Sequence, residues 1–237
     1  MNNTNHGFSE MIKSEEPVKS VNRRNFLRSA GLTTVAGALV MASCKTTTDP
    51  IPSNAVDLGS GDVGILNYAY ALEQLEAAFY VQVISTPYSG MTDAEKSLLT
   101  DIRDHEIIHR DFFKTALGTS AIQALEVNFS SIDFTSRASV LGTAKVFEDT
   151  GVSAYNGAGK LIKDVGYLLL AGKIVSVEAR HAAAIRDLLQ PNSAFFAGDD
   201  VVDTTNGLDK ATKPSDILAA VQPFIKTPIS GANLPTA

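Results

Sequence analysis

The order in which glutamate and histidine recur along this chain is the feature that most constrains its fold. A Glu-x-x-His sequence occurs twice, and a lone glutamate lies on the helix predicted before each copy. In a helix, positions i and i+3 lie on one face, so each Glu-x-x-His directs a carboxylate and an imidazole toward the same point. Two such helices, with one glutamate from each of two others, would bring six ligands together. They are Glu73, Glu106, His109, Glu148, Glu178 and His181.

Apolar spacing and cap residues predict four long helices that carry these residues. The capping-box sequence from Thr92 to Glu95 is a strong start signal for the second helix, and Asp164 caps the fourth. The connection between the second and third helices, residues 119–134, is long, which suits a bundle whose halves pack as pairs. The predicted helices cover residues 62–84, 92–117, 136–162 and 164–190.

The chain is therefore predicted to be all-α, with a bundle over residues 61–190 and a C-terminal wrap over residues 191–237. The wrap is irregular, with one short helix predicted from Ser215 to about Phe224 and no convincing β-hairpin signal. Four glycines in the third predicted helix cost helix stability, so we expect close helix–helix contact as the compensation. They are Gly142, Gly151, Gly157 and Gly159.

Residues 1–43 are predicted to be a twin-arginine signal peptide. Arg23 and Arg24 precede two apolar residues, an arrangement that resembles the twin-arginine export motif. The uncharged apolar run over residues 30–42 is too short to span a bilayer and is typical of an export signal. We therefore expect the twin-arginine translocation machinery to be one partner of this chain.

The predicted signal ends in Met41-Ala42-Ser43-Cys44, which resembles the lipobox of bacterial lipoproteins. In those proteins the cysteine is lipidated and becomes the new N-terminus. We therefore expect Cys44 to hold the protein to a lipid bilayer in the cell envelope, on the periplasmic or outer face. Residues 44–60 would then form a flexible tether. The alternative is a plain signal followed by a free cysteine.

Charge and cysteine content limit the partners and the metal ligands. The formal net charge of -6 argues against nucleic acid as a partner. Cys44 is the only cysteine, which excludes an intramolecular disulfide and a thiolate cluster within one chain. Any metal must therefore be held by histidine and carboxylate groups, which suit iron, manganese or zinc. Four carboxylates would balance the charge of two divalent ions.

Three stretches of the sequence resemble the ferritin-like superfamily of di-iron and di-manganese proteins. They are LNYAYALEQLEAAFY, FEDTGVSAY and EARHAAAIRDLL, and they more narrowly resemble exported bacterial ferritin-like proteins related to plant desiccation-associated proteins. The resemblance implies a ferritin-like four-helix bundle in which the six residues above bind two iron or manganese ions. It also places Tyr80 near the metals, in a catalytic role in redox chemistry, and is compatible with a homo-oligomer.

Several alternatives stay open for individual residues. The six predicted ligands could instead be surface helix charges or a metal-free buried polar network. Glu76 shares a helix face with Glu73 but is expected to neighbour the site or face solvent rather than bind metal. Tyr155 mirrors Tyr80 and is either a core tyrosine or a residue close to the metals. His105 is expected to face solvent.

Three functions are consistent with this pattern. The first is an oxidase- or peroxidase-type protein that uses two redox-active ions. The second is a metal-binding, stress-protective protein without turnover. The third is a structural envelope protein that kept the fold and lost the metal.

Overall fold

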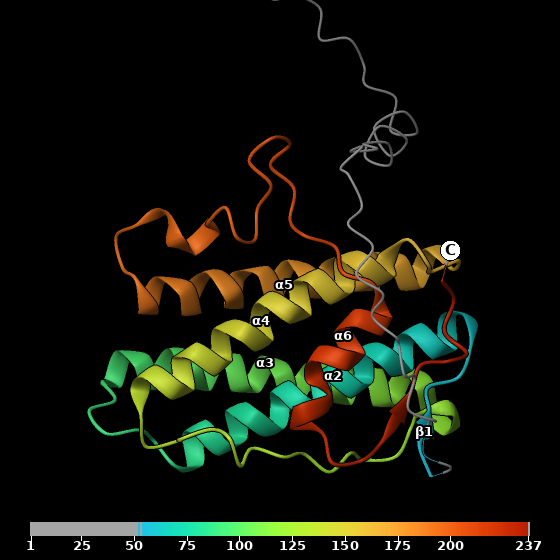
Figure 1. The fold of residues 1–237 in the computed structure, drawn as a ribbon, viewed down its shortest axis with the longest axis horizontal. Helices are drawn as coiled ribbons and strands as arrows, with labels where there is room; N and C mark the ends of the chain where they lie inside the picture. The colour runs from blue at the N-terminus through green and yellow to red at the C-terminus, as the bar shows by residue number, and fades with distance from the viewer. Residues whose placement is uncertain (1–51, 53, 237) are drawn as a thin grey trace, which may run out of the picture. The chain divides into compact units, whose positions relative to one another are not determined.

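Four long helices and one short helix form the body of the protein. The computed structural model describes residue 52 and residues 54–236 (Figure 1). The helices pack as two antiparallel pairs, α2 on α3 and α4 on α5, which confirms the predicted all-α bundle. Their bounds are α2 (Gly61–Ser85), α3 (Asp93–Leu117), α4 (Arg137–Gly159), α5 (Val165–Leu189) and α6 (Pro214–Val221).

Side-chain caps explain where two of the long helices begin. The Thr92 hydroxyl accepts a hydrogen bond from the backbone N–H of Glu95 at 3.2 Å, and the Glu95 carboxylate accepts one from the backbone N–H of Thr92 at 2.9 Å. This is the predicted capping box at the start of α3. The Asp164 carboxylate accepts a bond from the backbone N–H of Tyr167 at 3.0 Å and caps α5.

Helix α2 lies at the centre of the core, and most of its residues are buried. The connection between α3 and α4 covers it, because Phe79 packs its ring against Phe129 and Phe134 of that segment. Amide side chains fasten the same segment. Asn67 donates to the Ser120 carbonyl at 2.9 Å, and the Gln74 carbonyl oxygen accepts from the backbone N–H of Leu125 at 2.9 Å. The long connection is therefore an ordered cover for α2.

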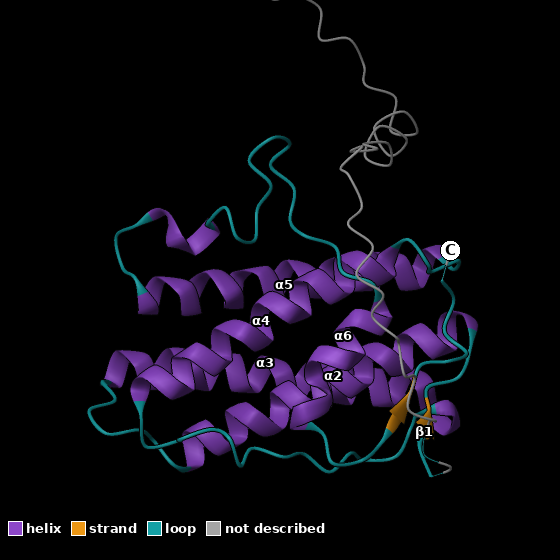
Figure 2. Cartoon of the chain, in the orientation of Figure 1, coloured by secondary structure: helices purple, strands orange, loops and turns teal. Residues whose placement is uncertain are grey.

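A short parallel strand pair corrects one sequence prediction. Strand β1 (Val56–Asp57) pairs with β2 (Ile229–Ser230), as the orange arrows in Figure 2 show. Leu58, directly after β1, is fully buried. Residues 54–60 are therefore packed on the bundle, although they fall in the segment predicted to be a flexible tether. The remaining N-terminal predictions, including Cys44 and the signal peptide, lie outside the described residues.

The C-terminal segment lies over α4 and α5 and is held by a buried arginine. Arg186 is 1% exposed and donates paired hydrogen bonds to the carboxylates of Asp149 and Asp200. The segment contains two short 3₁₀ turns and α6. They are η2 (Ala194–Ala197) and η3 (Gln222–Phe224). Asp149 lies on α4, so the same guanidinium also joins α4 to α5.

Gly157 shows what the small residues of α4 accommodate. A Cβ added there would lie 1.8 Å from the carbonyl oxygen of Thr212, so no larger residue fits without moving the backbone. The backbone N–H of Thr212 also donates to the Ser153 carbonyl at 2.9 Å. The expected close contact thus exists at Gly157, but its partner is the C-terminal segment rather than another helix.

Among the described helices, none is long and apolar enough to cross a membrane.

Candidate metal centre

The six predicted ligand residues meet inside the bundle. Each of the four long helices contributes at least one of them, so the two helix pairs face each other across a polar cluster. Glu73, Glu106 and Glu148 are completely buried, and Glu178 is 1% exposed. Because charged groups are rarely buried without partners, this placement excludes the alternative that they are surface helix charges.

The six residues divide into two groups whose ligand atoms lie within 4.8 Å of one another. One group adds Glu73 and His109 to a shared pair of glutamates, and the other adds Glu148 and His181 to the same pair. The shared pair is Glu106 and Glu178, the glutamates of the two Glu-x-x-His sequences. Each group could hold one cation with one imidazole and one carboxylate of its own, and the two groups share the two other carboxylates.

Both histidines turn the same ring nitrogen toward the carboxylates. His109 Nδ1 lies 2.8 Å from Glu178 Oε1 and 3.5 Å from Glu73 Oε2. His181 Nδ1 lies 2.9 Å from Glu106 Oε1 and 3.1 Å from Glu178 Oε2. The i and i+3 spacing of each Glu-x-x-His therefore places its two side chains at one point, as the sequence predicts.

Unpartnered buried atoms gather in this cluster. Among the described residues, eight buried side-chain nitrogen or oxygen atoms make no hydrogen bond of good geometry, and six of the eight belong to the cluster. Two of the six, His109 Nδ1 and Glu106 Oε1, nevertheless lie within 2.9 Å of Glu178 and His181. Buried polar atoms are normally hydrogen-bonded. Atoms of ligand type that converge without such bonds fit a bound cation. The six are Glu73 Oε2, Glu106 Oε1 and Oε2, His109 Nδ1, Glu148 Oε2 and Glu178 Oε1.

A comparison with protein-family models agrees with this geometry. The model described as a ferritin-like domain matches residues 61–191, more than half of the chain. The chain belongs to the ferritin-like domain family. A search of curated proteins finds no match. The family match covers the four long helices that carry the cluster, and it ends just before the C-terminal segment.

Glu73 and Glu148, which each belong to only one ligand group, are the outer glutamates of the ferritin-like domain. A tyrosine from the opposite helix pair binds each of them. The Tyr80 hydroxyl on α2 donates to Glu148 Oε1 on α4 at 2.5 Å, and the Tyr155 hydroxyl on α4 donates to Glu73 Oε1 on α2. Burial and the adjacent carboxylates raise the pKa of both tyrosines well above the ordinary value, so they stay neutral donors. Each outer glutamate thus has one oxygen fixed by a tyrosine and the other free to bind a cation. Tyr155 is therefore a residue of the site.

His105 is the member of the ferritin-like site that sequence analysis missed. It is exposed, as predicted, but its ring stacks on His181 with centroids 5.2 Å apart. Its Nδ1 lies 2.9 Å from His181 Nε2, within hydrogen-bond distance, and this contact orients His181 from outside the cluster. The only sequence signal was its position one turn before His109, and its partner lies on another helix.

Several side chains of the ferritin-like cluster have raised pKa values and so bind protons more tightly than usual. A cation would have to displace these protons in order to bind. Burial alone would lower the pKa of His181, but its contacts with Glu106, Glu148 and Glu178 outweigh burial and raise the pKa to about 12. The carboxylates of Glu178 and Glu73 likewise outweigh burial at His109 and raise its pKa to about 9. Burial raises the pKa of Glu106 well above its ordinary value, and the charge of Glu178 adds to the rise. Cation binding must therefore release protons.

Glu76 lies beside the cluster without entering either ligand group. It is 4% exposed, and a Cβ added at Gly151 would lie 3.1 Å from its Oε1. Gly151 therefore makes room on α4 for a buried carboxyl group from α2. Burial raises the pKa of Glu76 well above its ordinary value, and the charges of Glu106 and Glu148 raise it further. A neutral carboxylic acid next to the ligands is the result.

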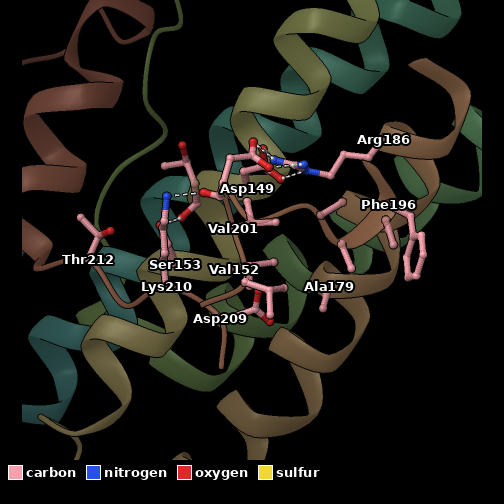
Figure 3. Close-up of a pocket in the computed structure, with 16 residues that line it drawn as sticks. Asp149, Val152, Ser153, Ala179, Arg186, Phe196, Val201, Asp209, Lys210 and Thr212 are labelled. Carbon is pink, nitrogen blue, oxygen red and sulfur yellow. Dashed lines mark hydrogen bonds and ion pairs between the residues drawn. The ribbon is translucent and has the colours of Figure 1, made fainter. Parts of the chain in front are cut away.

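A separate pocket of about 390 Å³ lies on the outer side of α4 and α5 (Figure 3). Asp149, Ser153 and Ala179 line it from the helices, and Val201 and Lys210 line it from the C-terminal segment. Its described lining residues include none of the six cluster residues. The pocket therefore belongs to the packing of the C-terminal segment on the ferritin-like domain and gives no direct entry to the metal centre.

Proposed function

We propose that the ferritin-like domain binds two iron or manganese ions and uses them in oxidase- or peroxidase-type chemistry. The observation that carries the proposal is the convergence of six buried atoms, none with a hydrogen bond of good geometry, in two ligand groups that share Glu106 and Glu178. Four carboxylates carry four negative charges, which two divalent cations balance. Without such a balance, burying these carboxylates side by side costs several kcal/mol per charge.

The residues of the chain explain what the site would do with bound ions. Two neighbouring redox-active ions supply electron transfer to dioxygen or hydrogen peroxide. The helices hold the donors in place before any ion arrives, and burial of Glu73, Glu106 and Glu148 keeps bulk water away from them. Tyr80 and Tyr155 hold the outer carboxylates by hydrogen bonds, and a phenol in this position is a source of an electron and a proton.

Metal stoichiometry tests the binding part of the proposal. We expect protein purified from its native envelope to contain iron or manganese, and titration of the metal-free protein to approach two ions per chain. Glu178→Gln should bind fewer, because that carboxylate belongs to both ligand groups. Glu126→Gln, a change in the connection outside the cluster, is the control. A stoichiometry near zero with the helices intact by circular dichroism would refute the proposal.

Reaction with oxidants tests the catalytic part. The protein loaded with ferrous iron should be oxidised by dioxygen or hydrogen peroxide faster than free ferrous iron. Tyr80→Phe should leave the metal content unchanged and alter the oxidation rate, because its hydroxyl contacts only the outer oxygen of Glu148. If the loaded protein is inert to both oxidants, the alternative of a non-catalytic, stress-protective metal-binding protein is the better account.

We also propose that the chain is exported by the twin-arginine route and anchored in the cell envelope through lipid on Cys44. The support is the sequence pattern of residues 22–44. Labelled fatty acid should enter the wild-type protein but not Cys44→Ser, and equal labelling would exclude the anchor. Replacing Arg23 and Arg24 by lysine should block export, and unaffected export would indicate another route.

A further inference from the structure

The first turns of α5 expose a cluster of large apolar side chains, which we call the α5 patch. Val165 and Leu169 are 69% and 64% exposed, and Leu168 and Leu170 are 44% and 37% exposed. Single exposed apolar residues are common on protein surfaces, but a contiguous group usually marks a contact surface. Further along the same helix, Ile174 is buried in the core, so the exposure is confined to the start of α5.

The α5 patch lies at the end of the bundle where the chain enters from its N-terminal segment. The Asp62 carboxylate in the first turn of α2 accepts hydrogen bonds from the backbone N–H groups of Lys163 and Asp164, at 2.9 and 2.7 Å. These bonds join the start of α2 to the start of α5, and Figure 1 shows both helices beginning at the same end. A chain held by an anchor before residue 54 is therefore held at this end.

Exposed lysines surround the α5 patch. Lys160 and Lys163 precede it and Lys173 follows it, on a chain whose formal net charge is -6. Asp62 and Asp164 lie beside Lys163 and accept hydrogen bonds from backbone N–H groups, so the three lysines exceed these two carboxylates by one positive charge. Apolar side chains bordered by lysines are the pattern of a surface that rests on anionic lipid.

We infer that the α5 patch docks on the surface of an anionic lipid bilayer, with its apolar side chains at the acyl boundary and its lysines among the headgroups. This inference rests on the proposed lipid anchor at Cys44, which would hold the protein at a membrane. The chain from Cys44 to Asn54 spans at most about 35 Å when extended, which keeps this end of the bundle near the membrane. The metal centre lies deeper in the bundle and stays clear of the contact.

A second copy of the chain is a poorer occupant of the α5 patch. In a two-fold symmetric contact the same surface lies on both sides, so the patch would bring six lysines, three from each copy, into one interface. Like charges brought together in this way oppose association. An anionic headgroup layer instead complements all three lysines.

Vesicle sedimentation tests the inference without the lipid anchor. A chain of residues 44–237 that carries Cys44→Ser keeps every residue that the structure describes. It should sediment with vesicles of phosphatidylglycerol and phosphatidylcholine, less with phosphatidylcholine alone, and less at high salt. The double change Val165→Ser and Leu169→Ser should weaken binding about tenfold or more, because it removes two apolar contacts.

The control is the double change Val81→Ser and Ile108→Ser, which removes two exposed apolar residues from other helices. It should bind vesicles as the parent chain does. The inference is wrong if the parent chain does not bind, if both double variants bind equally, or if Val165→Ser and Leu169→Ser only dissociate a dimer. Metal content and fatty-acid labelling are measured separately, so failure here is distinct from failure of the proposed metal site or anchor.

Discussion

The two helix pairs carry ligands in the same order, yet each is fastened to the rest of the chain in a different way. On the α2–α3 side, the uncharged amides of Asn67 and Gln74 hold the connecting segment. On the α4–α5 side, the charged Arg186 of α5 binds Asp149 of α4 and holds the C-terminal segment through Asp200. The difference shows that neutral hydrogen bonds attach one outer segment to the bundle, whereas an ion pair attaches the other.

His109 and His181 differ in how deeply they are buried and in how many carboxylates they contact. The side chain of His109 is 12% exposed and meets two carboxylates, whereas that of His181 is 5% exposed and meets three. His105 also contacts His181 from outside. The two ligand groups thus contain the same residue types but differ in their surroundings, and the group that contains His181 has more contacts to hold it in place.

The largest expected effect comes from removing the ion pairs that Arg186 makes with Asp149 and Asp200. Arg186→Met should lower the free energy of unfolding by about 3 kcal/mol, because it removes both guanidinium hydrogen bonds of the partly buried Asp149 and leaves it only Lys145, 3.5 Å away. Thermal unfolding should show a midpoint about 6–12 °C lower. Arg180→Met, an exposed arginine on the same helix, is the control and should change stability by less than about 0.5 kcal/mol. Equal stability of the two variants would contradict the role of Arg186.

Removing either histidine compares the two cation positions directly. His181→Ala and His109→Ala should each weaken binding of one ion by about a hundredfold or more, since even residues that only support a ligand cost up to that much. We expect the larger loss for His181→Ala, because that imidazole meets more carboxylates. Metal titration by calorimetry measures both. A larger loss at His109 would reverse the comparison.

Removing the amide hydrogen bonds of Asn67 should lower stability less than removing the ion pairs of Arg186 does. Asn67→Leu should lower the free energy of unfolding by about 2 kcal/mol, because the Leu58 and Ser120 carbonyls and the Ile122 N–H lose their partner. Urea unfolding measures the change. Asn206→Leu, in an exposed turn, is the control. A cost above that of Arg186→Met would show that the amide side is the stronger fastening.

The raised pKa values give the metal-free protein a distinctive pH dependence. His109 has a folded pKa of about 9 against 6.5 unfolded, so it binds a proton more tightly in the folded state. Its contribution is fully present below pH 6.5 and is lost as the pH rises through about 9. We expect His109 to account for a loss of about 1 kcal/mol of stability per pH unit in that interval, measured by urea unfolding, and His181 to add to this loss because its pKa is raised to about 12. His109→Gln should reduce the slope by the share of His109, and an unchanged slope would contradict this assignment.

The smallest expected effect comes from replacing His105, which contacts His181 from outside the cluster. His105→Gln should weaken one ion by about tenfold, since it removes a contact that orients His181 rather than a ligand. The ion associated with His109 should bind as before, because the only His105 hydrogen bond among the described residues is to His181. Metal titration separates the two ions. Equal weakening of both ions would show that His105 does not act on His181 alone.

Local rules explain which parts of this molecule could be predicted from its sequence. The helices and the six ligands follow from periods of three and four residues, which depend only on neighbours within one helix. The pairing of β1 with β2 and the contact of His105 with His181 depend on segments far apart in the chain. No local pattern records such partners. Arg186 is an example, because nothing near it indicates that Asp200 would be its partner.

The crosswise tyrosine bonds have a consequence for how the protein unfolds. Helix α2 packs mainly on α3, and α4 mainly on α5, although residues of both pairs share one apolar core. Tyr80 and Tyr155 each reach from one pair to a predicted ligand of the other. The cluster therefore lies where the two helix hairpins meet. Cations bound there would hold the two hairpins together, and the stability of the protein would rise with the concentration of metal.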